Sequence, residues 1–510
     1  MDRYELFDSL MALFEKIDTE YRVIDRDGFK LDLLDVLVAS LYLGAIQSQY
    51  EGIEDSFPYA NLPVHKKILL FPKRLLKRLD DYSQLIEQRR IASSGDNSIL
   101  TEEDVVFFPV EPTHLVQQIP VAKILVECGK RICFVTNKKK LYDKLQEEGF
   151  SVHFIQTNST SNSSINFNTQ MLFDQIKMQN NQSENSRIES DVLEFICLKI
   201  KYLLNGVVAM SDRIYQLVTQ IKPRAVVDGN DFTLEGRITA RICKLMNISS
   251  ANIMHGSIAG EPLDSLHIVD KFFLYGSQAK DYLVSLGLSA SNLIVTGDPH
   301  IDKVVVGDKS IHPLIKKELP LKTSHGYILL ALSGPGHCTT HEHFDKIVNG
   351  VVSFSVKEQN IDIIAKLHRK DSKDNYSKIK QHHPGNSVHV VEYNSKGFPK
   401  NIYDWLRGCK LVITGSSTVA IEAMLMGIPV ITVDFMNEYQ GVDFIDTGAT
   451  IHVTKEEELH ETIYDAFSSA EKYSGTTSKA QQYIESYYYM PDGNASQRIA
   501  DHLIESMGIN

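Results

Sequence analysis

Residues 414–433 read TGSSTVAIEAMLMGIPVITV and contain a single charged side chain, Glu422. The apolar run KLVIT leads into this stretch and predicts a buried strand, and GSS predicts a tight corner. A helix is expected over Thr418–Met426, ending at a left-handed cap on Gly427, with the next strand over Pro429–Val433. The stretch therefore predicts one strand–helix–strand unit of a parallel α/β fold.

The whole chain has the composition of an ordinary soluble globular protein. It is 43% hydrophobic and 23% charged. Its length of 510 residues is sufficient for at least two domains with cores of their own. The formal net charge is −12, so no overall positive field is available to hold a polyanion. We therefore expect no nucleic-acid partner, and any phosphate would have to be bound by local groups.

The cysteines and the first residues bear on location. The six cysteines are scattered without a CxxC pair, which favours reduced thiols over a disulfide framework or a zinc knuckle. The opening residues MDRYELFDSL carry acids where a signal peptide needs a basic flank. No apolar run approaches the roughly 18 residues of a membrane span. We expect a cytoplasmic protein without a transmembrane segment, whose contact with a membrane is at most peripheral.

Short β-rich runs alternate with helical patterns along the chain, which is typical of parallel sheets covered by helices. The first half supplies KILLF, DVVFF, RICFVT, SVHFIQ, RAVVDG, SSANIMHG, KFFLYG and NLIVTG. The second supplies GYILLALS, IDIIAKLH, SVHVVEY, KLVITG and PVITVDF. No internal repeat is evident. The sequence therefore predicts two α/β domains.

Polar stretches suggest where these domains divide. Residues 157–187 are rich in Asn, Ser and Gln, and they predict a surface insertion that buries little and holds at most one helix. The polar stretch 306–324 separates the two sets of strands. We therefore expect a first domain over 1–310, a second over 325–476, and a helical stretch over 477–510 that packs back on the first.

The corner after KLVIT is a candidate phosphate site, because ligands of parallel α/β sheets bind beyond the carboxyl ends of the strands. Glycine allows close approach, and hydroxyls and helix amides donate hydrogen bonds. The candidate residues are Gly415, Ser416, Ser417 and Thr418. One turn later, the Glu422 carboxylate could accept two hydrogen bonds from a ribose diol. An ordinary helix cap, with Glu422 bonded to backbone or to an arginine, remains an alternative.

Two further stretches of the second domain favour the same chemistry. A strand, a Gly-Pro-Gly corner and a helix follow one another in ALSGPGHCTTHEHF, which makes Gly334 and Gly336 candidate phosphate-loop residues. Cationic donors gather where the strand IDIIAKLH ends, and a phosphate or diphosphate is their natural counter-ion. They are Lys366, His368, Arg369 and Lys370. Ordinary turn glycines and solvated charges are the alternatives.

The first domain offers candidates for acid–base chemistry. Asp228 and Asp231 follow the strand RAVV, and His255 follows the strand SSANI. A positioned carboxylate or imidazole could deprotonate an acceptor hydroxyl, and a protonated imidazole could hold a leaving phosphate. The alternatives are a turn or cap for the acids and a loop histidine for His255.

Two groups raise the question of a metal. Two histidines four residues apart on a helix could bind zinc, but HCTTHEHFD lies at a helix start, and no third ligand at fixed geometry is implied. The cluster consists of His337, His341, His343 and Asp345. The DRD run, Asp25–Asp27, precedes a glycine turn in a region expected to be helical. We expect no metal site in either place.

Together these motifs resemble the GT-B superfamily, in particular capsule and teichoic-acid glycosyltransferases, CDP-glycerol glycerophosphotransferases and UDP-N-acetylglucosamine 2-epimerases. The resemblance extends from about Val226 to Phe435 and is strongest in MHGSI, KLHRKD and TGSSTVAIEAMLMGIPVI. It implies two Rossmann-like domains facing across a cleft, with the nucleotide of the donor bound by the second. It also implies particular roles: phosphate contacts from Ser416, Ser417 and Thr418, ribose from Glu422, diphosphate from His368 and Lys366, and a contribution of His255 and Gly256 from the first domain.

The resemblance predicts a metal-independent glycosyltransferase that moves a sugar from a nucleotide-sugar donor to a glycan or lipid-linked acceptor in bacterial surface glycan biosynthesis. No cofactor is expected, since the nucleotide sugar is a substrate. Three alternatives stay open: a CDP-glycerol glycerophosphotransferase, a UDP-sugar 2-epimerase, and a nucleotide-binding module without activity. The large N-terminal part, where an acceptor platform would lie, favours transfer.

Overall fold

The structure is a computed structural model. It describes residues 3–26, 29–50, 101–155, 167–183, 188–256, 262–305, 310–322, 326–336, 339–369, 371–439 and 442–508. The expected strand KILLF lies outside these residues. None of the helices in the described ranges is long and apolar enough to cross a membrane.

The chain forms two compact units, each built on its own parallel sheet. Unit 1 consists of residues 1–275, 279–299 and 496–510, and unit 2 of residues 276–278 and 300–495. Unit 1 holds a seven-stranded sheet and unit 2 a six-stranded sheet, and every pairing within them is parallel. Such sheets are buried on both faces, which explains the nearly continuous apolar runs of their strands.

The unit 1 sheet has the strand order β5-β4-β3-β6-β7-β8-β9. Its strands are β3 (Val105–Phe108), β4 (Ile132–Thr136), β5 (Val152–Phe154), β6 (Ala225–Asp228), β7 (Ser249–Ile253), β8 (Lys271–Leu274) and β9 (Leu293–Val295). The helices that follow these strands are α6 (Pro112–Glu127), α7 (Lys139–Glu147), α10 (Leu234–Leu245) and α11 (Ser277–Ser285). The short helix η2 (Pro262–Leu266) precedes β8.

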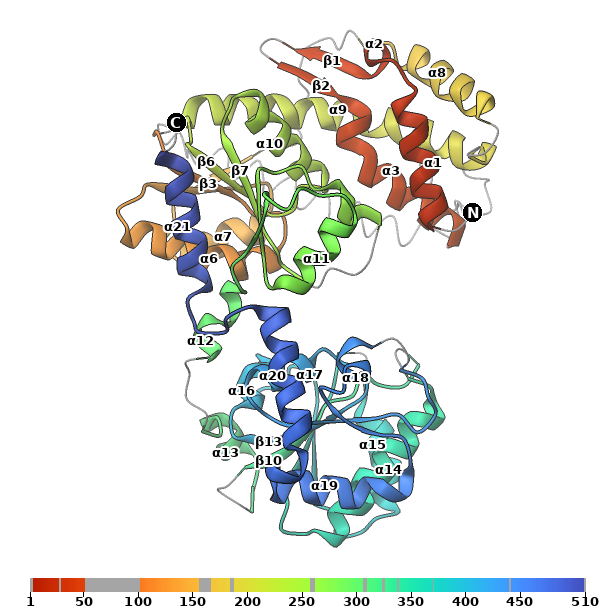
Figure 1. Cartoon of the computed structure of the whole chain (residues 1–510), viewed down its shortest axis with the longest axis vertical. Helices are drawn as coiled ribbons and strands as arrows, with labels where there is room; N and C mark the ends of the chain where they lie inside the picture. The colour runs from red at the N-terminus through yellow and green to blue at the C-terminus, as the bar shows by residue number, and fades with distance from the viewer. Residues whose placement is uncertain are drawn as a thin grey trace. The chain divides into compact units, whose positions relative to one another are not determined.

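An N-terminal group of elements packs on the α10 side of unit 1 (Figure 1). It comprises α1 (Arg3–Glu15), α2 (Thr19–Arg22), β1 (Val23–Arg26), β2 (Phe29–Asp32), α3 (Leu33–Tyr50), α8 (Thr169–Gln182) and α9 (Ser190–Ile221). Two expectations are corrected here. Asp25 lies in the antiparallel β1–β2 hairpin and not in a helix. The polar insertion contains the helix that the sequence allowed, α8, but it buries more than expected, because Leu172 and Ile176 are fully buried in the core.

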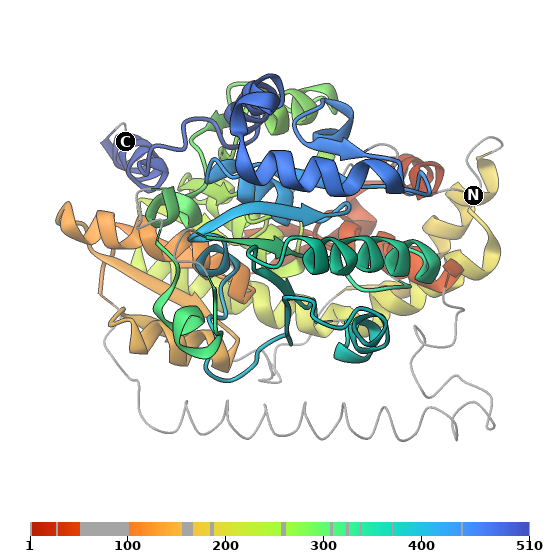
Figure 2. The same cartoon turned by 90° about the horizontal axis from the view of Figure 1, so that it is seen from below.

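The unit 2 sheet has the strand order β12-β11-β10-β13-β14-β15. Its strands are β10 (Tyr327–Leu330), β11 (Ile363–Lys366), β12 (Val388–Val391), β13 (Cys409–Thr414), β14 (Val430–Val433) and β15 (Ile451–Val453). Its helices are α12 (Asp302–Val305), α13 (Pro313–Glu318), α14 (His341–Lys357), α15 (Lys373–Gln381), α16 (Ile402–Leu406), α17 (Val419–Leu425), α18 (Asp443–Asp446), α19 (Leu459–Ser468) and α20 (Ser474–Tyr488), of which α14 and α19 lie side by side (Figure 2).

The C-terminal helices divide between the two units, which differs from the expected grouping of 477–510. Helix α20 packs against α17 and stays in unit 2. Helix α21 (Ala495–Gly508) buries Ile499 and Leu503 in the core of unit 1. It is also held by a hydrogen bond from Arg498 Nε to the Thr296 carbonyl at 2.7 Å. Only α21 carries an apolar face that completes the unit 1 core.

The two sheets share one topology. Counted along the chain within each unit, the first six strands of unit 1 and the six of unit 2 both follow the order 3-2-1-4-5-6. In this arrangement ligands bind outside the carboxyl ends of the strands, where the order reverses between the first strand and the fourth. The fold therefore points to the loops after β3 and β6 in unit 1, and to those after β10 and β13 in unit 2.

Candidate functional site

The carboxyl edge of the unit 2 sheet brings Lys366 and Glu422 together. Lys366 is the last residue of β11, and Glu422 lies in the first turn of α17. The two side chains interact electrostatically, although β10 separates their strands in the sheet. The residue expected to bind the diphosphate, Lys366, therefore lies beside the residue expected to bind the ribose, Glu422.

Burial dominates the electrostatics of this pair. It raises the pKa of Glu422 to about 7, although the Lys366 charge acts in the opposite direction. It also lowers the pKa of Lys366, against the Glu422 charge. Among the described residues, neither the ammonium nor the carboxylate has a hydrogen-bond partner, and the nearest aromatic contact of Lys366 Nζ is the Tyr393 ring at 5.8 Å. Both groups are therefore available to a polar ligand.

Gly415 is required by the packing of an aromatic ring. A Cβ built on Gly415 would lie 2.5 Å from the hydroxyl oxygen of Tyr439 and 2.7 Å from the ring carbon that carries it. Tyr439 is buried and closes over the corner after β13. The expected reason for this glycine was close approach of a phosphate, and the structure supplies a second reason within the protein.

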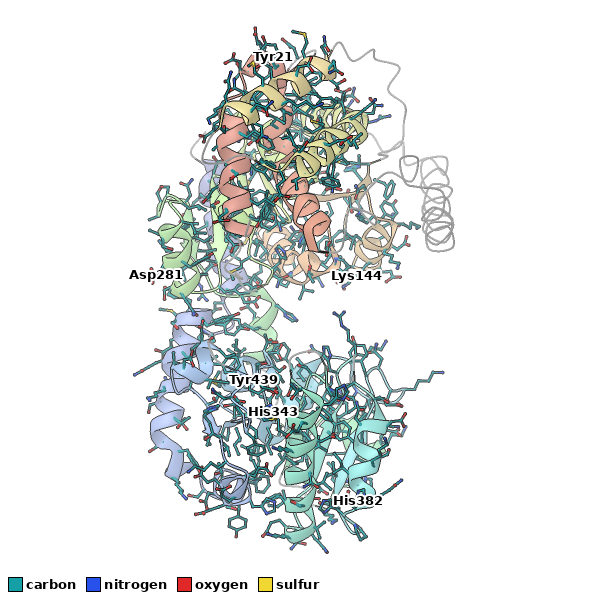
Figure 3. The ribbon with its side chains drawn as sticks, turned by 90° about the vertical axis from the view of Figure 1, so that its right-hand side faces the viewer. Tyr21, Lys144, Asp281, His343, His382 and Tyr439 are labelled. Carbon is teal, nitrogen blue, oxygen red and sulfur yellow. The ribbon has the colours of Figure 1, made fainter. Side chains whose placement is uncertain are left out.

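A hydrogen-bonded loop after β14 holds Tyr439 in place. Asp434 accepts from the amides of Glu438 at 2.8 Å and Tyr439 at 2.9 Å. The buried His343 ring accepts from the Phe435 amide through Nε2 at 3.0 Å, so Nδ1 carries the proton toward Glu438 Oε2 at 2.8 Å. The centroid of the His343 ring lies 5.4 Å from that of the Tyr439 ring, and Figure 3 shows the two residues together. His343 is thus a structural residue of the loop.

The loops after β10 and β11 also touch. Gly334 has a φ of +83°, and a Cβ on it would lie 3.0 Å from the Cβ of Asp371. Asp371 closes the turn after β11, because its amide donates to the His368 carbonyl at 2.9 Å. Gly336 has a φ of +79°. His368 is half-buried on this turn and Arg369 is exposed. The two candidate loops therefore lie together, and their glycines permit the left-handed conformation and the contact.

The first amides of helix α17 are bonded to the corner Ser416–Thr418 that precedes it. Helix α17 begins at Val419, whose amide donates to Ser417 Oγ at 3.4 Å, and the Ala420 amide donates to the Ser417 carbonyl at 3.0 Å. Thr418 is the exposed N-cap residue and makes no side-chain cap. Gly427 has the expected left-handed φ of +73°. The amides of Val419 and Ala420 are therefore engaged within the protein, and a phosphate here would depend on Lys366 and on groups of the corner itself.

In unit 1, Asp231 is fully buried and fully bonded. Its carboxylate accepts from the Ile268 amide at 2.6 Å, the Val269 amide at 3.2 Å and Asn252 Nδ2 at 3.2 Å, and it pairs with His267 Nδ1 at 2.5 Å. Burial alone would raise its pKa, but the His267 ring and these hydrogen bonds lower it to about 2. This carboxylate holds a loop in place and is a weak base at neutral pH.

Asp228 has the opposite environment. Burial, together with the negative charge of Asp231, raises its pKa well above the ordinary value. Its Oδ1 accepts from the Asn230 amide at 3.4 Å, while Oδ2 has no partner among the described residues. Gly236 leaves the room for this oxygen, since a Cβ there would lie 2.4 Å from it. Asp228 therefore holds its proton more tightly than an ordinary aspartate, and it lies at the carboxyl edge of the sheet.

His255 lies on the same edge, beside a histidine that the sequence reasoning missed. His114, in the first turn of α6, has its ring centroid 4.3 Å from that of His255. His114 Nδ1 accepts from the Val110 amide at 3.0 Å, and burial lowers its pKa to about 3. Burial also lowers the pKa of His255, helped by the charge of His267. His255 is therefore neutral at pH 7 and free to accept a proton.

The described residues contain no group of three His, Cys, Asp or Glu side chains that could hold a metal ion. Of the histidine-rich run, His337 lies outside the described residues, and both nitrogens of His343 already have partners in the loop after β14. Asp25 is exposed and faces Lys30 at 3.6 Å.

A family model described as UDP-N-acetylglucosamine 2-epimerase matches residues 266–504. This span includes Lys366 and Glu422 and leaves out Asp228, Asp231 and His255. A search of curated proteins gave no match.

Solved structures resemble the chain more widely. A crystal structure of UDP-N-acetylglucosamine 2-epimerase superposes with a TM-score of 0.52 at 16% identity, covering 80% of this chain and 97% of that chain. The UDP-GlcNAc 2-epimerase from Methanocaldococcus jannaschii gives a TM-score of 0.52 at 14% identity, covering 79% and 99%. At these identities the likeness shows the fold: two Rossmann-like α/β domains of the GT-B type.

Proposed function

We propose that the protein is an enzyme acting on a nucleotide-activated sugar, and that it transfers the sugar to an acceptor without a metal ion. The nucleotide binds at the carboxyl edge of the unit 2 sheet. Glu422 accepts hydrogen bonds from the ribose hydroxyls, and Lys366 neutralises the diphosphate. Ser416, Ser417, Thr418, His368 and Arg369 lie on the adjoining loops and complete the phosphate contacts.

One observation carries this proposal: a cation and a carboxylate that have no hydrogen-bond partner in the described part of the chain meet where the strand order of a Rossmann-like sheet reverses. A desolvated carboxylate is costly unless something donates to it. A ribose diol supplies two donors and a diphosphate supplies the counter-charge for Lys366. The family match over the same residues supports a nucleotide sugar as the ligand.

In unit 1 we assign proton transfer to His255. Its neutral ring can accept the proton of an attacking hydroxyl. Asp228, whose proton is retained more strongly than that of an ordinary aspartate, is assigned as a hydrogen-bond donor on the same edge, while Asp231 positions the loop that carries His267. The acceptor is a glycan or a lipid-linked sugar, and the process is bacterial surface glycan synthesis.

Measurements of nucleotide preference and metal dependence test the proposed nucleotide site and the proposed metal-independent transfer. Thermal shifts with UDP, CDP, CMP, GDP and dTDP should show stabilisation by one nucleotide diphosphate, growing with its concentration as expected for binding to the folded state. A preference for CDP would favour transfer of glycerol phosphate. Turnover should survive EDTA, and loss of activity that Mn²⁺ restores would contradict the proposed leaving-group stabilisation.

A UDP-sugar 2-epimerase is the second candidate, favoured by the description of the matching family model. Epimerisation at C2 must break and remake a C–H bond within one substrate, whereas transfer needs a second molecule. UDP-GlcNAc should therefore be incubated alone and followed by NMR. Conversion to a C2 epimer without an acceptor would establish the epimerase, while UDP release that requires an added acceptor would establish the transferase. A protein that binds UDP but changes no sugar under either condition would be a binding module.

A further inference from the structure

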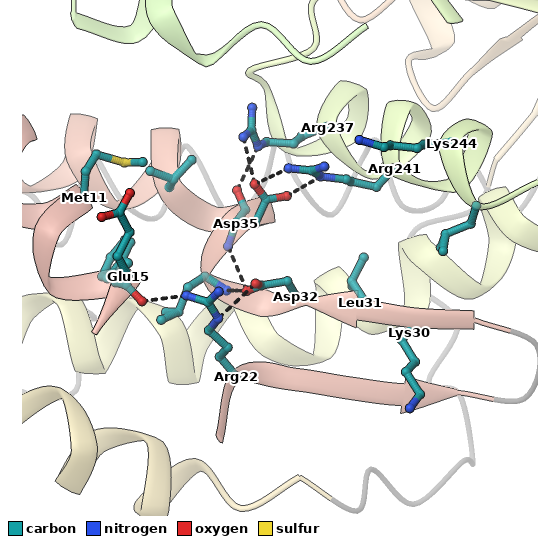
Figure 4. Close-up of a pocket in the computed structure, with 14 residues that line it drawn as sticks. Met11, Glu15, Arg22, Lys30, Leu31, Asp32, Asp35, Arg237, Arg241 and Lys244 are labelled. Atoms are coloured by element: carbon teal, nitrogen blue, oxygen red, sulfur yellow. Dashed lines mark hydrogen bonds and ion pairs between the residues drawn. The ribbon is translucent and has the colours of Figure 1, made fainter. Parts of the chain in front are cut away.

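Unit 1 contains a second pocket that shares no residue with the candidate site. It has a volume of about 470 Å³ and lies between α10 and the N-terminal elements α1, α3 and β2 (Figure 4). Pockets that bind small molecules typically enclose about 300–1,000 Å³. The pocket is therefore large enough for a small organic ligand.

One wall of the pocket is cationic. It is formed by three residues of α10, each about one turn from the next: Arg237, Arg241 and Lys244. Asp35 pairs with Arg237 at 2.8 Å and with Arg241 at 2.6 Å. One carboxylate therefore faces two guanidinium groups, and this wall keeps an excess of positive charge.

The remaining donors differ in how they are engaged. Arg237 is buried and is also bonded to the carbonyls of Asp35 and Leu266. Arg241 uses Nε and one terminal nitrogen on Asp35, which leaves its second terminal nitrogen without a partner among the described residues. Lys244 is exposed and has no ion pair with any described residue. Arg241 and Lys244 are the donors that a ligand can reach.

The lining residues outside α10 are largely apolar, and they also include the exposed Glu15 and Lys30. Phe14, Leu31, Leu34 and Val38 are buried residues that line the pocket, and Figure 4 shows the Leu31 side chain directed toward α10. Asp32, which also lines the pocket, is paired with Arg22 at 3.0 Å. An apolar surface that faces unpaired cationic donors matches a ligand with an apolar body and an anionic head.

We propose that this pocket binds a small oxyanion with an apolar body, a carboxylate or a phosphate monoester. Arg241 and Lys244 hold its charge, and its body lies against Leu31, Leu34 and Val38. The site is separate from the nucleotide site and stands whether or not the proposed function is correct.

Calorimetric titration with phenyl phosphate, benzoate and phenol tests the site, and it is carried out with UDP at saturation so that the nucleotide site is filled. At least one anion should bind with a Kd of about 1 mM or lower, while phenol, which lacks the charge, should bind too weakly to measure. The tighter of the two anions identifies the head group. Failure of both anions to bind, or equal binding of phenol, would overturn the proposal.

Substitutions locate the binding. Lys244→Met should weaken the bound anion about 5- to 10-fold through loss of one charge-assisted hydrogen bond, and Lys244→Glu should weaken it further. Because Lys244 is exposed, both variants should keep the melting temperature of the parent. Lys140→Met, at an exposed lysine of α7, is the matched control and should bind as the parent does. Equal affinity of the parent and both Lys244 variants would place the anion elsewhere and refute the site.

Discussion

The two units share one strand order, yet the buried carboxylates at the carboxyl edges of their sheets differ in their hydrogen-bond partners. Unit 1 surrounds Asp231 with donors from Asn252, His267 and two backbone amides. Unit 2 leaves Glu422 desolvated, with the Lys366 charge nearby but no donor among the described residues. The first carboxylate stabilises the fold, and the second costs stability in the free protein. A desolvation cost that no protein group offsets is typical of a ligand-binding site, where the bound ligand supplies the missing hydrogen bonds.

The largest effect should come from the fully bonded carboxylate. Asp231→Asn puts an amide where two backbone N–H groups and a histidine donate, and it leaves at least one buried donor unpaired. We expect the free energy of unfolding to fall by about 3 kcal/mol or more, as for other broken buried charge networks. Urea unfolding at pH 7 measures this change.

Asp228→Asn is the matched control, because it makes the same chemical change on the same edge. Burial already disfavours the charged form of Asp228, so an amide of nearly equal size should alter stability by less than about 1 kcal/mol. Equal losses in the two variants would mean that both carboxylates are ionised, and would remove the distinction drawn between them.

The next effect concerns chemistry in unit 1. His255→Ala should lower turnover about 100-fold or more, the usual result of losing a general base. UDP affinity should stay near that of the parent, because the proposed nucleotide contacts lie in unit 2. Steady-state kinetics measures the turnover, and calorimetry measures the UDP affinity. His255→Gln, which keeps hydrogen bonding but cannot accept the proton, should be as slow as the alanine variant. A variant with full turnover would exclude His255 from the reaction.

Much of the fold could be predicted from the sequence, because buried parallel strands are nearly continuous apolar runs. KLVIT and PVITV became β13 and β14, and Gly427 became the left-handed cap between them. The sequence does not predict the β1–β2 hairpin, because its strands carry charges and the DRD run lies in a region whose pattern favours helix. The three residues of β15 form too short a run to stand out.

The candidate site was predictable only where the chain supplies a local pattern. Glu422 stands out as a lone charge in an apolar run, and Lys366 as a cation at a strand end. His114, His267 and Tyr439 have no such signal, because their roles depend on contacts with distant residues. His114 could have been found from topology, since it follows the strand that proves to be central in unit 1.

A smaller effect is expected at the nucleotide site. Glu422→Gln keeps the size of the side chain and removes the charge that would strengthen the proposed hydrogen bonds to the ribose. UDP binding should weaken by about 1.5–3 kcal/mol, and the variant should stay folded. Calorimetry with UDP measures the loss. Glu458→Gln, an exposed change in the same unit, should leave UDP affinity unaltered. An unchanged affinity in Glu422→Gln would remove the assigned role of this carboxylate.

The same substitution should have a stability effect of opposite sign in the free protein. The folded pKa of Glu422, about 7, lies above the ordinary glutamate value of 4.5. Between these two values the folded state binds more protons than the unfolded state, so this group lowers stability as the pH rises from 4.5 through 7. Above pH 7 the penalty is constant. Glu422→Gln lacks it and should be more stable than the parent by about 1–2 kcal/mol at pH 8, and equal to it near pH 4.5. Urea unfolding at both pH values, without nucleotide, measures the difference.

Saturating UDP should shrink or reverse the stability gain of Glu422→Gln at pH 8, because the parent is expected to bind the nucleotide more tightly. A gain of the same size at both pH values would show that the carboxylate is not desolvated in unit 2, and the contrast with Asp231 would fail.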